Sequence, residues 1–350
     1  MHKGFQMDTE INRNDTLKQT KQAALHALQK YEIDWTSIHF IQISEHVTFR
    51  IVSDRGESFL LRVHSADKNQ KEISSELEWT SALKSKGITL PVAVSNKSGS
   101  LVTDTYSSDG KQYHVTLLTW VEGERLEKEK HTDETIQKMG ELMANLHEAS
   151  TDFSPSTDFS RPSWGIHTFQ RDWTHLKLNH GHFISNEALE LYSMAAEKVT
   201  ELLKTLTSHE QDFGMIHADL HNGNIVFHEG EPYPIDFGRC GFGYHLYDIA
   251  QSILGLFPPQ RAHFIKGYEK IKQLDGEYIP KLESFFVMAI IEAYSFHAEN
   301  SAETDGLIEE QPYAEAILKA YLNGRSFLFE PLEIPYDLNS EFKPEIESIN

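Results

Sequence analysis

The sequence has a single cysteine, Cys240, and no apolar run long enough to cross a membrane. One cysteine cannot form a disulfide within the chain, which fits a reducing compartment. A transmembrane helix needs about 20 consecutive apolar residues, and the charged start MHKGFQMDTEINRND lacks the apolar core of a signal peptide. We therefore expect a cytoplasmic protein without a membrane partner, in which Cys240 packs rather than reacts.

Basic residues are scarce, since 32 Lys and Arg face 53 Asp and Glu and give a net charge of −21. This balance argues against binding to nucleic acid or to an anionic membrane. It is compatible with a cationic or zwitterionic small molecule. An acidic surface also serves solubility, and part of the charge lies between Glu330 and Glu347, so the charge alone does not identify a ligand.

The composition is that of an ordinary globular chain, with 350 residues, 39% hydrophobic and 24% charged. This length allows two lobes with separate cores, and no internal repeat or low-complexity stretch interrupts it.

One stretch carries the residues needed for phosphoryl transfer. Residues 216–224 read IHADLHNGN, and the run DFG begins at Asp236, twelve residues after Asn224. Asp219 can accept the proton of a hydroxyl group, while Asn224 and Asp236 supply the oxygen ligands that Mg²⁺ prefers. A base with two metal ligands is what transfer from a magnesium nucleotide requires. The pattern predicts a kinase.

The pattern HxDxxxxN followed by IDFG resembles the aminoglycoside phosphotransferase and choline kinase family, relatives of the protein kinases. Protein kinases usually have Arg between the His and the Asp, whereas this chain has Ala218, as is typical of small-molecule kinases. The run GFGYHLYDIA is similar to the bacterial branch of homoserine kinase type II and stress-response kinases. Matching landmarks extend from about Tyr31 to about Tyr268.

The resemblance implies an α+β, protein-kinase-like, two-lobed fold with ATP and Mg²⁺ as cofactors. It places a small antiparallel sheet with a helix in an N-terminal nucleotide-binding lobe, residues 1–118, and a hinge at residues 119–123. A larger, mostly helical catalytic and acceptor-binding lobe would span residues 124–330, followed by a tail at residues 331–350.

The resemblance also assigns roles in the catalytic segment. Asp219 would be the catalytic base, and Asn224 would serve both catalysis and the metal, which it shares with Asp236. We group His217 with the catalytic residues, although a histidine beside apolar residues more often holds a loop by hydrogen bonds. His221 is expected to be only a loop residue near the site.

The N-terminal lobe supplies the expected nucleotide contacts. In FLLRVH, Arg62 stands where kinases carry the phosphate-contacting lysine of the third strand. Its acidic partner on the next helix is Glu76 or Glu78, of which the pattern SELEW favours Glu76. The hinge run LLTWVEGE offers the carbonyl of Thr119 and the amide of Val121 to the adenine edge.

The phosphate-covering loop departs from the family pattern, because Ser44 and Glu45 precede His46 with no glycine among them. Such a loop cannot bring its backbone as close to phosphate as a glycine-rich loop does. We expect side chains and metal to hold the phosphates instead.

Apolar periodicity predicts the remaining elements. Helices are expected over residues 15–31, 69–86, 132–147, 189–206, 247–256, 261–273, 281–300 and 311–323. Strands are expected over residues 38–43, 47–52, 59–64 and 113–121, and a hairpin turning at residues 229–232 leads into Asp236. Residues 151–164 are expected to form a loop.

The expected partner is a small-molecule hydroxyl acceptor carrying an amine, such as an aminoglycoside, homoserine or choline-like compound. Acidic and aromatic side chains of the later helices are the candidates for its pocket: Tyr244, Asp248, Glu292, Tyr294, His297 and Glu299. Two alternatives stay open, a Ser/Thr protein kinase of the stress-response type and a nucleotide-binding scaffold with little catalysis. The oligomeric state is not predicted.

Overall fold

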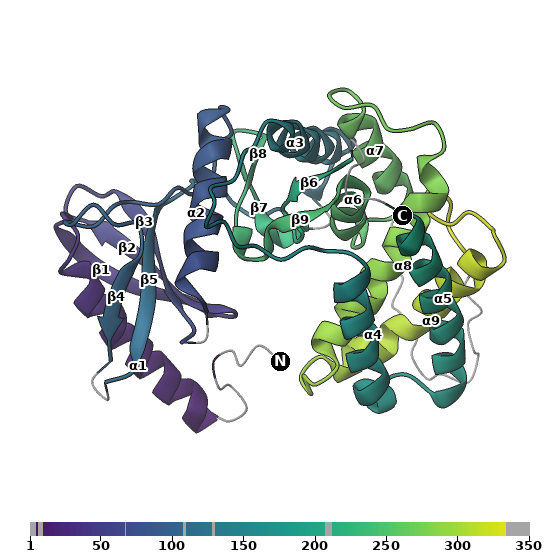
Figure 1. Ribbon diagram of the computed structural model, residues 1–350, viewed down its shortest axis with the longest axis horizontal. Helices are drawn as coiled ribbons and strands as arrows, with labels where there is room; N and C mark the ends of the chain where they lie inside the picture. The colour runs from purple at the N-terminus through teal and green to yellow at the C-terminus, as the bar shows by residue number, and fades with distance from the viewer. Residues whose placement is uncertain are drawn as a thin grey trace, which may run out of the picture. The chain divides into compact units, whose positions relative to one another are not determined.

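The computed structural model describes residues 5, 10–66, 68–107, 110–127, 130–206 and 212–333 (Figure 1). The chain divides into two compact units. The first contains Met1–Gly165, Thr207–Leu256 and Ala262–Gly276, and the second contains Ile166–Leu206, Phe257–Arg261 and Glu277–Asn350. The predicted lobe boundaries at residues 118 and 124 stay a prediction, and most of the predicted tail, from residue 334 onward, lies outside the described residues.

The N-terminal part of the first unit is a five-stranded antiparallel sheet in the order β1-β2-β3-β5-β4. Its elements are α1 (Glu10–Leu28), β1 (Trp35–Ile43), β2 (His46–Ser53), β3 (Ser58–His64), α2 (Gln70–Ser85), β4 (Thr103–Tyr106) and β5 (Gln112–Thr119). Strand β4 was not predicted, because its sequence TDTY has a single apolar residue, the exposed Tyr106, and so shows no apolar alternation. Its edge position depends on pairing with β5.

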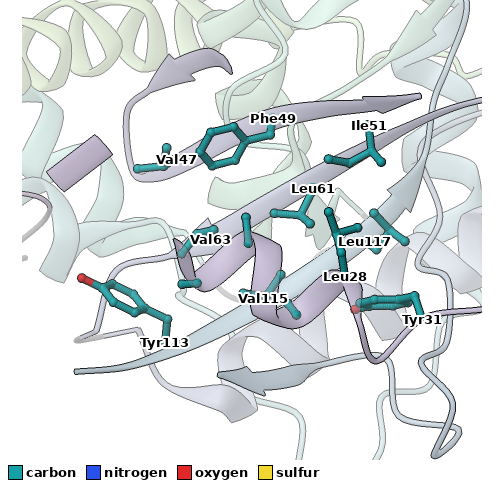
Figure 2. Packing of buried hydrophobic residues seen from close by; sticks show 13 residues of the cluster. Leu28, Tyr31, Val47, Phe49, Ile51, Leu61, Val63, Tyr113, Val115 and Leu117 are labelled. Atoms are coloured by element: carbon teal, nitrogen blue, oxygen red, sulfur yellow. The ribbon is translucent and has the colours of Figure 1, made fainter. Parts of the chain in front are cut away.

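The two faces of this sheet serve different purposes. Alternate residues of β2, such as Val47, Phe49 and Ile51, pack with Leu61 and with helix α1 in a buried core (Figure 2). Because side chains alternate across a strand, the neighbours of Leu61 point to the other face. There Leu60 lies in a second apolar cluster together with Ile73 and Leu77 of α2. Arg62 shares this second face, which faces α2.

The catalytic segment is built from short strands in the same unit. Strand β6 (Phe213–Ile216) pairs antiparallel with β9 (Gly241–Tyr244), and β7 (Ile225–His228) pairs with β8 (Glu231–Pro234). The 3-10 turns η3 (Asn222–Asn224) and η4 (Phe237–Arg239) lie beside the β7-β8 hairpin along the chain. The predicted hairpin before Asp236 is confirmed, with Glu229 and Gly230 at its turn.

Helices make up most of the rest. They are α3 (Asp133–Thr151), α4 (Ile166–Asn179), α5 (Asn186–Thr205), α6 (His245–Ile253), α7 (Pro258–Tyr268), α8 (Tyr278–His297) and α9 (Thr304–Leu322), with the 3-10 turn η2 (His180–His182) between α4 and α5. The predicted α+β class, with an N-terminal antiparallel sheet and a mostly helical C-terminal part, is confirmed. Within the described ranges, no helix is both long and apolar enough to span a bilayer.

One helix was not predicted, and another was predicted too short. Helix α4 was missed, because only Phe169 and Leu176 of its side chains are buried and they leave a weak apolar stripe. Helix α9 begins at Thr304 rather than at residue 311, and Pro312 lies inside it. Proline usually marks the first turn of a helix, so its presence within α9 hid the earlier start.

Candidate active site

Helix α6 fixes the backbone of the catalytic loop through one side chain, Asp248. Its Oδ1 accepts a hydrogen bond from the amide of Ala218 at 2.7 Å, and its Oδ2 accepts one from the amide of His217 at 2.9 Å. Ala218 has a φ of 61°, a left-handed conformation that a non-glycine residue adopts at a cost. The fully buried carboxylate of Asp248 therefore holds the loop in a strained shape.

Asp219 and Asn224 lie against each other in this loop. The side-chain amide of Asn224 donates to the Asp219 carbonyl at 2.9 Å and to its Oδ2 at 3.0 Å. With its NH₂ group directed to Asp219, Asn224 has its amide oxygen turned the other way. Burial raises the pKa of Asp219, an effect that the charges of Arg239 and His221 oppose. A carboxylate with a raised pKa suits a group that must accept a proton.

His217 joins the loop to the strand that leads to Asp236. Its ring is 1% exposed, and its Nε2 lies 3.1 Å from the carbonyl of Ile235, to which it donates. The ring also packs on Phe237, with 4.5 Å between centroids. Burial lowers the pKa of His217, so the ring is neutral at physiological pH. These contacts support a role in holding the loop.

Asp236 lies at the centre of a charged cluster. Its backbone is left-handed, with φ 63° and ψ 69°, which turns the side chain out of the strand. Its Oδ1 lies 3.3 Å from Nη2 of Arg62 and 3.7 Å from Nε2 of His46. Burial alone would raise the pKa of Asp236, but Arg62 and then His46 hold it well below its usual range. The carboxylate is therefore ionised and able to bind a cation.

Arg62 and Glu76 form a buried ion pair between β3 and α2. Nη1 of Arg62 lies 2.8 Å from Oε1 of Glu76, and the two side chains are 5% and 6% exposed. Glu78, the other candidate, instead accepts hydrogen bonds from the amide and hydroxyl of Ser156, both at 2.7 Å. The structure thus brings Glu76 and not Glu78 to Arg62.

Side chains fill the turn where a glycine-rich loop would cover phosphates. The turn between β1 and β2 closes through the amide of Ser44 and the carbonyl of His46 at 3.0 Å. Glu45 pairs with Lys68 at 3.2 Å, and the His46 ring is buried over the loop that follows Asp236. A Cβ built on Gly238 would lie 3.3 Å from that ring, an already tight distance.

The predicted hinge is anchored on both sides. The amide of Thr119 donates to the Val92 carbonyl at 2.8 Å, and its hydroxyl accepts from the Val92 amide at 3.1 Å. After Val121, Gly123 has a φ of 141° and passes so close to β7 that a Cβ would lie 2.8 Å from the Phe227 carbonyl. The roles of Thr119 and Val121 toward adenine stay predictions.

Two buried polar residues that support the site were missed in the sequence. His147 of α3 lies with Nε2 3.0 Å from Oδ2 of Asp248 and Nδ1 2.8 Å from the hydroxyl of Tyr268. Its position at the end of the apolar stripe of α3 was the available signal. The other is Arg161, in a segment predicted only as a loop, for which no sequence signal existed.

The six candidate pocket residues do not fall in one compact unit. Tyr244 and Asp248 belong to the first unit, and the other four belong to the second. Asp248 is already engaged by the catalytic loop, and Glu299 forms an exposed ion pair with His175 at 3.2 Å. Glu292 and Tyr294 are each 5% exposed within α8.

Asn224 and Asp236 are the residues with the chemistry for a divalent metal. Among the described residues, no group of three or more His, Cys, Asp or Glu side chains could hold a metal by itself. Mg²⁺ commonly uses one or two protein ligands and completes its shell with phosphate oxygens and water. An ionised carboxylate and an oriented amide oxygen fit that pattern.

Comparison with known proteins identifies relatives across most of the chain. The amicoumacin kinase of Bacillus subtilis (strain 168) is 19% identical over 280 residues, which cover 76% of this chain and 81% of the relative. The solved structure of amicoumacin kinase hAmiN in complex with AMP-PNP, Ca²⁺ and Ami has a TM-score of 0.73 at 17% identity, covering 92% of this chain and 98% of that one.

Two further structures share the fold. A microcompartment-associated aminopropanol kinase has a TM-score of 0.73 at 24% identity, covering 86% of this chain and 97% of that one. Spectinomycin phosphotransferase APH(9)-Ia, in complex with ADP and spectinomycin, has a TM-score of 0.65 at 13% identity, covering 87% of this chain and 98% of that one. The predicted protein-kinase-like fold is confirmed.

A family model described as the phosphotransferase enzyme family, APH, matches residues 39–281. This match includes the sheet from β2 onward, the Arg62–Glu76 pair, the catalytic loop and Asp236. The predicted family resemblance is confirmed, while the narrower homoserine kinase and stress-response kinase branch stays a prediction. The chain is a phosphotransferase and belongs to the APH phosphotransferase enzyme family.

Proposed function

We propose that this protein transfers the γ-phosphoryl group of ATP to a hydroxyl group of a small, amine-bearing molecule, with Mg²⁺ as the metal. The observation that carries the proposal is the arrangement of Asp219 in hydrogen-bond contact with Asn224, together with an ionised Asp236 beside Arg62. A proton acceptor, a metal-ligand pair and a phosphate-binding cation are the parts that phosphoryl transfer uses.

In the proposed reaction, Asp219 orients the acceptor hydroxyl and takes its proton. The hydroxyl oxygen forms a bond to the γ-phosphorus as the bond from that phosphorus to the bridging oxygen breaks, so the electron pair leaves with ADP. Arg62 contributes a guanidinium, whose planar fork matches phosphate oxygens. Mg²⁺, held by Asn224 and Asp236, would neutralise charge on the phosphates when bound.

The adenine of ATP is proposed to bind at the hinge through the carbonyl of Thr119 and the amide of Val121. Backbone groups can read the adenine edge without a polar side chain, so the run LLTWV needs no polar side chain for this contact. The anchoring of the hinge to Val92 and Phe227 supports a fixed geometry for such contacts.

The amine-bearing acceptor is supported by charge and by the relatives. The net charge of −21 favours a cationic ligand over an anionic one. The names of three relatives, an amicoumacin kinase, an aminopropanol kinase and a spectinomycin phosphotransferase, indicate small-molecule acceptors for those proteins. Ala218, in place of the protein-kinase arginine, also favours a small-molecule acceptor over a protein hydroxyl.

A screen for ADP release tests the proposal. The purified protein is incubated with Mg²⁺-ATP and with amino alcohols, aminoglycosides, amino acids or a protein serine substrate, and Asp219→Asn is the matched control. We expect ADP release that depends on a small amine and disappears in the variant. With a cationic acceptor, KM should rise with salt, because exposed charges are screened beyond about 8 Å at physiological ionic strength. Labelling of protein serines with no small amine accepted would support the protein-kinase alternative instead.

A further inference from the structure

Arg161 is a buried cation that the proposed chemistry does not use. It lies in the irregular segment between α3 and α4, and its side chain is 3% exposed. Its Nε donates to the carbonyl of Cys240 at 2.6 Å, and its Nη2 donates to the carbonyl of Gly238 at 2.6 Å. Its Nη1 donates to the carbonyl of Glu72 at 3.2 Å and lies 4.0 Å from Oε2 of Glu76.

These contacts join two parts of the site that are far apart in sequence. Gly238 and Cys240 belong to the loop that follows Asp236, while Glu72 and Glu76 belong to helix α2. Glu76 is shared, since its Oε1 binds Arg62 and its Oε2 faces Arg161.

Together these contacts form a closed ring. Asp236 contacts Arg62, Arg62 binds Glu76, Glu76 faces Arg161, and Arg161 binds the carbonyl of Gly238, two residues from Asp236. The ring connects Asp236, the proposed metal ligand, to Arg62, the residue expected to contact phosphate.

The backbone of Asp236 gives a reason for this support. A non-glycine residue adopts a left-handed conformation such as φ 63° and ψ 69° only where its surroundings fix it. Arg161 binds carbonyl groups on the chain just after that residue. A lysine could not replace it there, because its single ammonium group lacks the fork that reaches several carbonyls at once.

The main chain around Arg161 is anchored without its side chain. The Pro162 carbonyl accepts from the Phe242 amide at 2.9 Å, and the Trp164 amide donates to the Phe242 carbonyl at 2.7 Å. Gly241 passes so close that a Cβ would lie 2.4 Å from the Pro162 carbonyl. Shortening the side chain of Arg161 should therefore leave this segment in place.

We propose that Arg161 is a positioning residue, which holds helix α2 and the loop carrying Asp236 in the arrangement that phosphoryl transfer requires. The proposal rests on the function proposed above. In this role Arg161, which lies outside the catalytic segment, sets the geometry of Asp236, the proposed metal ligand. Residues that orient a metal ligand typically change metal affinity or activity by about 10–100-fold when they are replaced.

The test compares Arg161→Lys and Arg161→Gln with the control Arg171→Gln, which removes an exposed arginine paired with its neighbour Asp172. The measurements are kcat, the Mg²⁺ concentration that gives half-maximal rate at saturating ATP, and calorimetric ADP affinity with and without Mg²⁺. For both Arg161 variants, we expect kcat to fall and half-saturating Mg²⁺ to rise, each within about 10–100-fold. Metal-free ADP affinity and the control should stay within about twofold of the wild type.

A merely structural role predicts a different result. Loss of folded protein would lower kcat but leave the half-saturating Mg²⁺ unchanged, and that outcome, or variants with wild-type constants, would overturn the proposal. If Arg161→Gln fails to fold, Arg161→Lys carries the test. If the wild type binds Mg²⁺-ADP but phosphorylates nothing, the proposed function fails, and the Mg²⁺ dependence of ADP binding still decides the role of Arg161.

Discussion

The buried ion pair between Arg62 and Glu76 allows stability and catalysis to be separated. Arg62→Met removes the guanidinium that lies 2.8 Å from a carboxylate only 6% exposed. Breaking one side of a buried pair destabilises a protein by about 3–5 kcal/mol. Because Arg161 remains 4.0 Å from the other carboxylate oxygen, we expect the lower end, about 3 kcal/mol.

The double variant Arg62→Met/Glu76→Met removes the stranded carboxylate as well. Replacing both members of a buried pair with apolar residues is often neutral. We expect recovery of only roughly 1–2 kcal/mol, because Asp236 has also lost Arg62 and Arg161 then faces only carbonyl groups. Activity should not recover. Loss of a preorganised charge at the reacting phosphate costs about 10²–10³-fold in rate, and both variants lack it.

Urea denaturation and turnover of the same preparations test this reasoning, with Arg55→Met in the exposed β2-β3 turn as control. The control should change stability by no more than about 0.5 kcal/mol. A double variant that regains near wild-type turnover would remove Arg62 from phosphate binding. A single variant that loses less than about 1 kcal/mol would show that the pair is not desolvated as the structure indicates.

Three other perturbations have distinct expected results. Asp219→Asn should lower kcat by about 10²–10⁴-fold with ATP affinity nearly unchanged, and normal turnover would remove Asp219 from the role of base. Asp236→Ala should weaken binding of Mg²⁺-ATP far more than that of metal-free ATP in calorimetric titrations, whereas equal losses would indicate a structural role. Burial lowers the pKa of His147 from 6.5 to about 3, so the unfolded chain takes up its proton first and stability falls as pH drops below 6.5. Protonation of His147 in the unfolded chain should lower the free energy of unfolding by about 1.4 kcal/mol at a pH one unit below 6.5. His147→Gln should reduce the difference in unfolding free energy between neutral and mildly acidic pH, and an unchanged difference would contradict the assignment.

The catalytic segment was predictable because its chemistry is local. Asp219 and Asn224 are five residues apart in one loop, and the hairpin before Asp236 has a turn that its sequence specifies. Arg62 was found through the family resemblance, since it stands in the apolar strand where kinases carry a lysine, and the structure pairs it with Glu76. The choice of Glu76 over Glu78 used the resemblance of SELEW to the family's helix. The structure places Glu76 at Arg62 because only one of two residues two positions apart on a helix can face the sheet.

The supports of the site were not predictable, because their partners are distant in sequence. Arg161 binds Gly238 across 77 positions, and His147 reaches Asp248 across 101. Arg161 has no local pattern that distinguishes it from a surface arginine, and the apolar stripe of α3 marks His147 only as a buried residue, without its partner. Likewise, α4 has too few buried residues to give a clear stripe, and the pairing of β4 is set by its neighbour strand rather than by its own residues.

The most direct test of the central claim identifies the phosphorylated product. The protein, Mg²⁺-ATP and a small amino alcohol are followed by ³¹P NMR, in parallel with Asp219→Asn. Our account predicts a new phosphate monoester of the amino alcohol that grows together with ADP in the wild type and is absent in the variant. Hydrolysis of ATP to inorganic phosphate with no phosphorylated product from any small amine tested, or equal product from Asp219→Asn, would contradict it.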